Sequence, residues 1–162
     1  HFCVVTSHLF IIPVVGVFGI GLDWKLENVL PPLCLLFCFA VSYMNGIVLE
    51  IGRKIRVPGK EAEGVLTYSS MLGANKATIL WIVILLITLV LSIAASVFAG
   101  YGLVAVIVLG VVFIICSYPA FIFLKNKSQQ VAKEIEYDSP FWTIMMCVPL
   151  GGVQMLSKFF FN

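Results

Sequence analysis

Apolar residues fill five long runs of this chain, and polar residues gather between them. Each run approaches the roughly 20 residues that an α-helix needs to cross a bilayer at about 1.5 Å per residue. Backbone groups in hydrocarbon must be bonded within the segment, and near-continuous apolarity lacks the alternation of barrel strands. The pattern therefore predicts an all-α bundle of transmembrane helices in a single domain, 1–162. The predicted spans are 2–22, 29–52, 77–99, 102–124 and 140–161.

Helix signals refine the last three of these spans. Small residues at helical spacing in the third span, which let helices approach closely, are Ser92, Ala95, Ser96 and Ala99. Ser139 and Pro140 have the residue types of an N-cap and a first helical turn. They predict that the fifth helix begins there, after a short polar loop over residues 125–138.

Composition supports a membrane protein. The chain is 61% apolar and 11% charged, whereas soluble domains average about 45–50% apolar and about 25% charged. No soluble domain or phosphate-binding glycine loop is visible, and we expect no nucleic-acid partner. The five cysteines lie in apolar runs without zinc-ligand spacing, so they are predicted to be small core residues.

The positions of the cations predict the topology. Most lie in the segments after the second and fourth spans: Arg53, Lys54, Arg56, Lys60, Lys76, Lys125, Lys127 and Lys133. Because cytoplasmic loops carry an excess of Lys and Arg, the loops 50–76 and 125–139 are predicted to be cytoplasmic. The chain starts almost inside a span at His1, so we expect it to be a fragment that lacks N-terminal helices.

The segment 50–63 concentrates charge at the end of the second run. Arginine and lysine bind phosphate oxygens, and carboxylates bind the Mg²⁺ that accompanies phosphates. Helical spacing places Glu50, Arg53 and Lys54 on one face, with Asn45 deeper in the membrane. These residues suit a ligand with a charged head and an apolar tail. The full charged set is Glu50, Arg53, Lys54, Arg56, Lys60, Glu61 and Glu63.

Plainer interpretations exist for the same residues. Arg53, Lys54 and Arg56 have the properties of ordinary positive-inside anchors that reach the lipid headgroups. Glu50 has the spacing of an i, i+4 partner of Lys54. His8, a polar residue at membrane depth in the first run, suits either a helix–helix hydrogen bond or a catalytic role.

Two stretches of the sequence resemble one family. Ser7-His8-Leu-Phe-Ile-Ile-Pro13, followed by Asp23-Trp24, is the first. Asn45-Gly-Ile-Val-Leu-Glu50-Ile-Gly-Arg53-Lys-Ile-Arg56, with Glu63-Gly-Val-Leu-Thr-Tyr68-Ser downstream, is the second and more specific. Together they resemble a bacterial branch of the UbiA-type intramembrane prenyltransferase superfamily. The five runs would match the last five helices of that nine-helix fold, in the bacterial inner membrane.

The resemblance implies a Mg²⁺-dependent transferase. Its expected substrates are an isoprenyl diphosphate and an aromatic or other lipophilic acceptor, bound between helices in the bilayer. The resemblance assigns Glu50, Glu61 and Glu63 to the metal and Arg53, Lys54 and Arg56 to the diphosphate. It makes Asn45, Tyr68 and His8 polar residues of the cavity.

Two features of the sequence qualify the expected activity. The family's first acidic motif has no counterpart in this chain, whose aspartates are Asp23 and Asp138. That motif would lie upstream of His1 if the chain is truncated, and it is lost if the chain is a degenerate member. In either case we expect the chain to be inactive by itself. Lys60 stands in the second acidic segment, where its charge opposes Mg²⁺ binding. The alternatives are a non-catalytic membrane scaffold and a piece of a transporter or channel.

Overall fold

The regular structure of the described chain is entirely helical. The computed structural model describes residues 14, 34–57, 67–98 and 102–147, and no strand occurs among them. The all-α prediction is therefore confirmed for this part of the chain. The helices are α2 (Cys34–Arg53), α3 (Tyr68–Leu72), α4 (Ala74–Phe98), α5 (Gly102–Lys125) and α6 (Gln129–Cys147).

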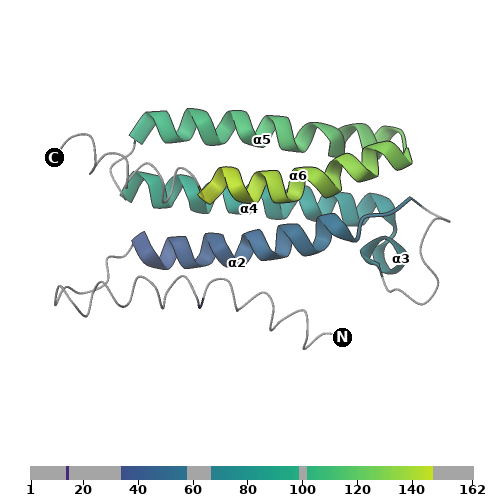
Figure 1. Cartoon of the computed structure of the whole chain (residues 1–162), viewed down its shortest axis with the longest axis horizontal. Helices are drawn as coiled ribbons and strands as arrows, with labels where there is room; N and C mark the ends of the chain where they lie inside the picture. The colour runs from purple at the N-terminus through teal and green to yellow at the C-terminus, as the bar shows by residue number, and fades with distance from the viewer. Residues whose placement is uncertain (1–13, 15–33, 58–66, 99–101, 148–162) are drawn as a thin grey trace.

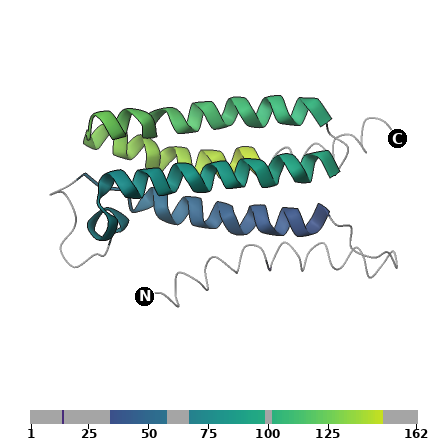
Figure 2. The ribbon, with the colours of Figure 1, turned by 180° about the vertical axis from the view of Figure 1, so that it is seen from behind.

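Four long helices form an antiparallel bundle. The helix α2 packs against α4 and α6, and α5 packs against the same two helices from the other side. Figure 1 shows that α2 and α5 run in one direction and α4 and α6 in the other. The reverse view in Figure 2 shows the same order. Each of these four described helices thus lies between two antiparallel neighbours, as the short connections from α4 to α5 and from α5 to α6 favour.

Within the described residues, two helices are long and apolar enough to cross a membrane by length and composition, whereas the sequence predicted five spans for the whole chain. These candidate spans are Ala74–Val97 and Val106–Lys125, which lie in α4 and α5. They match the predicted third and fourth spans. The predicted first span, 2–22, lies outside the described residues except for Val14, and the second and fifth are described in part.

The last helix begins earlier than the sequence predicted. The helix α6 starts at Gln129, so Ser139 and Pro140 lie inside it and the preceding connection is only residues 126–128. The Ser128 hydroxyl accepts a hydrogen bond from the backbone N–H of Gln130 at 3.3 Å. Ser128 is thus in the position of an N-cap.

Burial explains why the polar half of α6 is helical. Its buried residues recur at intervals of three and four, which gives one continuous inward stripe. Charged side chains between them conceal that stripe in the sequence. The buried residues of α6 are Ala132, Ile135, Ser139, Trp142 and Met146.

The third predicted span also extends further toward its N-terminus. The helix α4 begins at Ala74, and the short helix α3 precedes it. Thr67 caps α3, since its hydroxyl accepts from the Ser70 N–H at 3.1 Å. Gly73 separates the two helices with a φ of +83°, a conformation that glycine adopts without steric cost.

The small residues of α4 face the bundle, as predicted. Ser92, Ala95 and Ser96 are each at most 2% exposed. The Ser96 hydroxyl donates to the Ser92 carbonyl at 2.8 Å, so it satisfies its polarity within its own helix. Ala99 lies outside the described residues.

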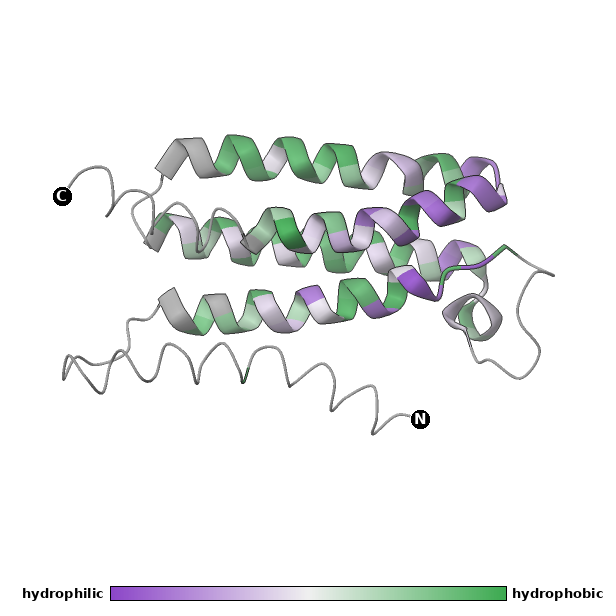
Figure 3. Ribbon diagram, viewed as in Figure 1, coloured by the Kyte–Doolittle hydropathy of each residue, from purple (hydrophilic) through white to green (hydrophobic). Residues whose placement is uncertain are grey.

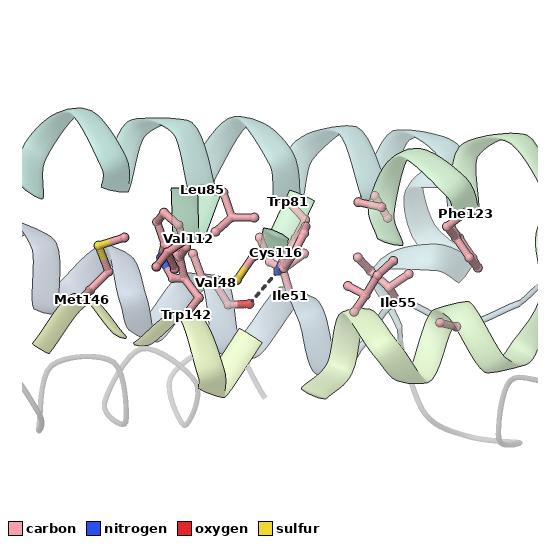
Figure 4. Packing of buried hydrophobic residues seen from close by; sticks show 14 of the residues in the cluster. Val48, Ile51, Ile55, Trp81, Leu85, Val112, Cys116, Phe123, Trp142 and Met146 are labelled. Atoms are coloured by element: carbon pink, nitrogen blue, oxygen red, sulfur yellow. Dashed lines mark hydrogen bonds between the residues drawn. The ribbon is translucent and has the colours of Figure 1, made fainter. Parts of the chain in front are cut away.

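Aromatic residues fill the centre of the bundle. Trp81 of α4 and Trp142 of α6 are fully buried, and Figure 4 shows them among aliphatic side chains from all four long helices. The rings of Trp142 and Phe113 meet edge to face, with 6.1 Å between centroids and 69° between planes. Such offset ring contacts add about 0.5–1.5 kcal/mol beyond the area that they bury.

The helices α2 and α6 approach each other closely at Gly52. A Cβ atom added to Gly52 would overlap the Ser139 Oγ, and it would lie 2.9 Å from the Ser139 Cβ and 3.0 Å from the Trp81 Nε1. The Trp81 indole N–H is within 3.2 Å of two acceptors, the Val48 carbonyl and the Ser139 Oγ. Three helices therefore meet at a point that has no room for a side chain at Gly52.

Replacing Gly52 by alanine should destabilise the bundle. The added methyl group must displace Ser139 or Trp81, and overpacking of this kind costs about 1–3 kcal/mol. Thermal unfolding in detergent micelles measures the loss. Gly110→Ala in α5 is the matched control, because a Cβ there meets nothing within 4 Å. That variant should be neutral or gain up to about 1 kcal/mol. Equal melting temperatures for the two variants would contradict the close contact.

Candidate functional site

Polar residues gather at one end of the bundle. Figure 3 shows hydrophilic residues at the end of α2, the start of α4 and the connection from α5 to α6. The described parts of the predicted loops 50–76 and 125–139 thus lie at the same end, as the charge pattern required. The cytoplasmic side itself remains a prediction.

Lys54 and Glu50 form an ion pair at the end of α2. The Lys54 ammonium also lies 5.8 Å from the centroid of the Tyr68 ring, within the range of a cation–π contact. The contact joins α2 to α3 across a segment of the chain that includes residues 58–66, which lie outside the described residues. The structure therefore brings together three predicted site residues, Glu50, Lys54 and Tyr68.

Arg56 binds a carboxylate that the sequence analysis did not assign. Its Nη1 donates to the Oε2 of Glu136 in α6 at 2.8 Å, between residues 80 positions apart. The two side chains are 37% and 33% exposed, so solvent reaches the pair. Glu136 lies in the segment predicted to be a loop, and only recognising α6 as a helix would have placed it opposite Arg56.

The main chain at Arg56 is held separately from its side chain. The backbone N–H of Arg56 donates to the Ser69 Oγ of α3 at 2.8 Å. Ile55, the preceding residue, is fully buried in the core. Arg56 is therefore fixed by α3 and by the core as well as by Glu136.

Arg53 differs from the other two predicted phosphate-binding cations. It is the last residue of α2 and is exposed. No ion pair links it to any residue that the structure describes. Its guanidinium is thus the most accessible of the three cations, although one turn of helix holds it beside the Glu50–Lys54 pair.

Asn45, which the sequence predicted as a polar residue of a cavity, is buried in α2. It is 3% exposed, and its Oδ1 has no hydrogen-bond partner among the residues that the structure describes. A buried amide oxygen without a partner costs about 1–3 kcal/mol. The third predicted cavity residue, His8, lies outside the described residues.

The described residues by themselves do not fit a magnesium ion. Glu50 is the only predicted metal-side acid among them, and the Lys54 ammonium already neutralises it. Glu61 and Glu63 lie outside the described residues. Across the described ranges, no group of three His, Cys, Asp or Glu side chains could hold a metal ion.

Asp138 of α6 is a second acid that the sequence analysis left without a role. One of its carboxylate oxygens is buried, and no residue in the described ranges forms a hydrogen bond with it. Burial, with a smaller contribution from the Glu134 carboxylate one turn earlier, raises the pKa of Asp138 from 3.8 to about 6. Desolvation disfavours the charged form, so the folded protein favours the neutral acid.

Comparison with known proteins found no matching family model, no matching curated protein and no matching solved structure. The function therefore has to be argued from the residues and their geometry.

Replacing Asp138 by asparagine should change how stability depends on pH. The pKa is higher in the folded state, so the contribution of Asp138 is fully present below its unfolded pKa of 3.8. That contribution is lost as the pH rises through about 6. Asp138→Asn carries no charge, so it should melt higher than the parent at pH 7. It should also lose the pH dependence between those two values.

Glu134→Gln is the control for Asp138→Asn. It retains the Asp138 carboxyl but removes a repulsive neighbour, so the transition should persist and move to lower pH. Thermal unfolding across a pH series in micelles measures both effects. If the stability of the parent and that of Asp138→Asn changed equally between pH 4 and 6, the pKa of Asp138 would not be raised.

Proposed function

We propose that this chain is part of an integral-membrane protein of the prenyltransferase type. In this proposal the polar end of the bundle binds the diphosphate of an isoprenyl diphosphate through Arg53, Lys54 and Arg56. The bond from the isoprenyl carbon to the diphosphate oxygen then breaks, diphosphate leaves, and the isoprenyl carbon bonds to an aromatic or other lipophilic acceptor, which releases a proton. The observation that carries the proposal is the placement of these three cations at the end of one helix, above an apolar bundle.

Exposed apolar side chains support a membrane location. Soluble monomers rarely expose contiguous apolar patches larger than a few hundred Å². The outward positions of α5 are nevertheless occupied by large apolar residues over most of the helix, and α4 shows the same feature. The exposed residues of α5 include Ile107, Val108, Val111, Ile114, Ile115 and Phe121.

The carboxylate contacts support an anion site. Lys54 and Arg56 each bind a carboxylate oxygen, which is chemically similar to a phosphate oxygen. Tyr68 and Ser69 of α3 hold these two residues in place, while Arg53 is exposed. A diphosphate that entered here would meet Arg53 at the end of α2 and two cations that already contact α3, so the ordering required on binding would be reduced.

The same contacts also favour a second candidate, a non-catalytic membrane scaffold. If the pairs Glu50–Lys54 and Arg56–Glu136 serve only to join helices, the cations need no ligand. The two functions differ in whether a diphosphate binds. Mg²⁺ and the roles of Glu61, Glu63 and His8 remain predictions of the family resemblance.

Replacing Arg53 by glutamine should weaken diphosphate binding. Hydrogen bonds to charged groups contribute about 1.5–3 kcal/mol, and the exposure of Arg53 favours the lower end, or about a tenfold loss of affinity. Isothermal titration of the full chain in nanodiscs with a short isoprenyl diphosphate measures this loss of affinity.

The control is Lys125→Gln, which removes one exposed cation from the same end of the bundle, on α5. It should bind nearly as well as the parent. Absence of binding by the parent would favour the scaffold. Equal affinities for the two variants would remove Arg53 from the site.

A further inference from the structure

Arg56 holds an anion that the chain itself supplies. Its Nη1 lies 2.8 Å from the Oε2 of Glu136, and about a third of each side chain is exposed. The pair joins the end of α2 to the polar half of α6. An anionic ligand in solution can therefore reach the guanidinium, but it meets Glu136 there.

The backbone position of Arg56 does not depend on this pair. Its N–H is bonded to the Ser69 Oγ at 2.8 Å, and Ile55 beside it is 0% exposed. Removing the Glu136 carboxylate would therefore leave Arg56 in place with its charge available. The helix α3 thus positions the main chain of Arg56, whereas Glu136 only occupies the guanidinium.

A carboxylate and a phosphate compete for the same guanidinium. Both present oxygens to its planar array of N–H donors, and both are stabilised by its positive charge. A ligand that binds Arg56 must displace Glu136 or share the guanidinium with a like charge nearby. In either case Arg56 binds an anionic ligand more weakly than an arginine without a carboxylate partner would.

We propose that Glu136 is an internal competitor that sets the affinity of this end of the bundle for diphosphate. The inference rests on the proposed function, because it assumes that Arg56 contacts the ligand. Glu136 then affects the ligand only through Arg56, whose guanidinium it occupies. Binding of a diphosphate would exchange the contact between α2 and α6 for a contact with the ligand.

Glu136→Gln tests the proposal with inorganic diphosphate as the probe. Exposed ion pairs contribute up to about 1 kcal/mol, so the variant should bind about two- to fivefold more tightly than the parent. Glu134→Gln is the matched control, since it removes the same charge from the same helix at an exposed position. Its affinity should stay close to that of the parent. Isothermal titration of the full chain in nanodiscs measures all three.

Replacing Glu136 in a variant that already carries Arg56→Gln shows whether Glu136 competes for Arg56 or has a structural role. If Glu136 acts through Arg56, its replacement should give no gain in the double variant Arg56→Gln/Glu136→Gln relative to Arg56→Gln. A gain of the same size in both backgrounds, or equal gains from Glu136→Gln and Glu134→Gln, would overturn the proposal. Weaker binding by Glu136→Gln would also overturn it and would assign the pair to structure. Absence of binding by the parent would instead overturn the proposed function.

Discussion

The packing of this bundle depends on the contact between Trp81, Gly52 and Ser139. The indole is the largest buried side chain of α4, and its N–H needs an acceptor in an apolar interior. It lies near the Val48 carbonyl of α2 and the Ser139 hydroxyl of α6. Because Gly52 has no side chain, α6 can approach α2 closely enough to supply the second acceptor. This contact sets the relative positions of three helices.

That contact also determines how the charged residues at the polar end of the bundle are placed. Gly52 immediately precedes Arg53, and Ser139 lies three residues after Glu136. Fixing Gly52 against Ser139 therefore brings the end of α2 beside the polar half of α6. Within one turn of the contact, Arg56 can reach Glu136 and Lys54 can reach Glu50. The position of the charges thus follows from the apolar packing below them.

The sequence predicted the helical class, the third and fourth spans and the i, i+4 spacing of Glu50 and Lys54, because each follows from periodicity within a single segment. It did not predict Glu136 or the start of α6. Ser139 and Pro140 are typical of a helix start. The helix nevertheless begins earlier, because burying the stripe from Ala132 to Met146 requires helix on both sides of Ser139. Pairing between residues 80 positions apart depends on how whole helices pack, which local patterns do not report.

Pro140 has a mechanical consequence for α6. Proline lacks the N–H that would bond the carbonyl four residues earlier, so the Glu136 carbonyl has no helical donor at that position. The hydroxyls of Ser139 and Thr143 bond carbonyls of the adjacent turns, those of Ile135 and Ser139. The ladder of α6 is therefore interrupted where its charged half meets its apolar half. Bending at this turn costs less than elsewhere in the helix, so it is a natural hinge between a segment suited to water and a segment suited to hydrocarbon.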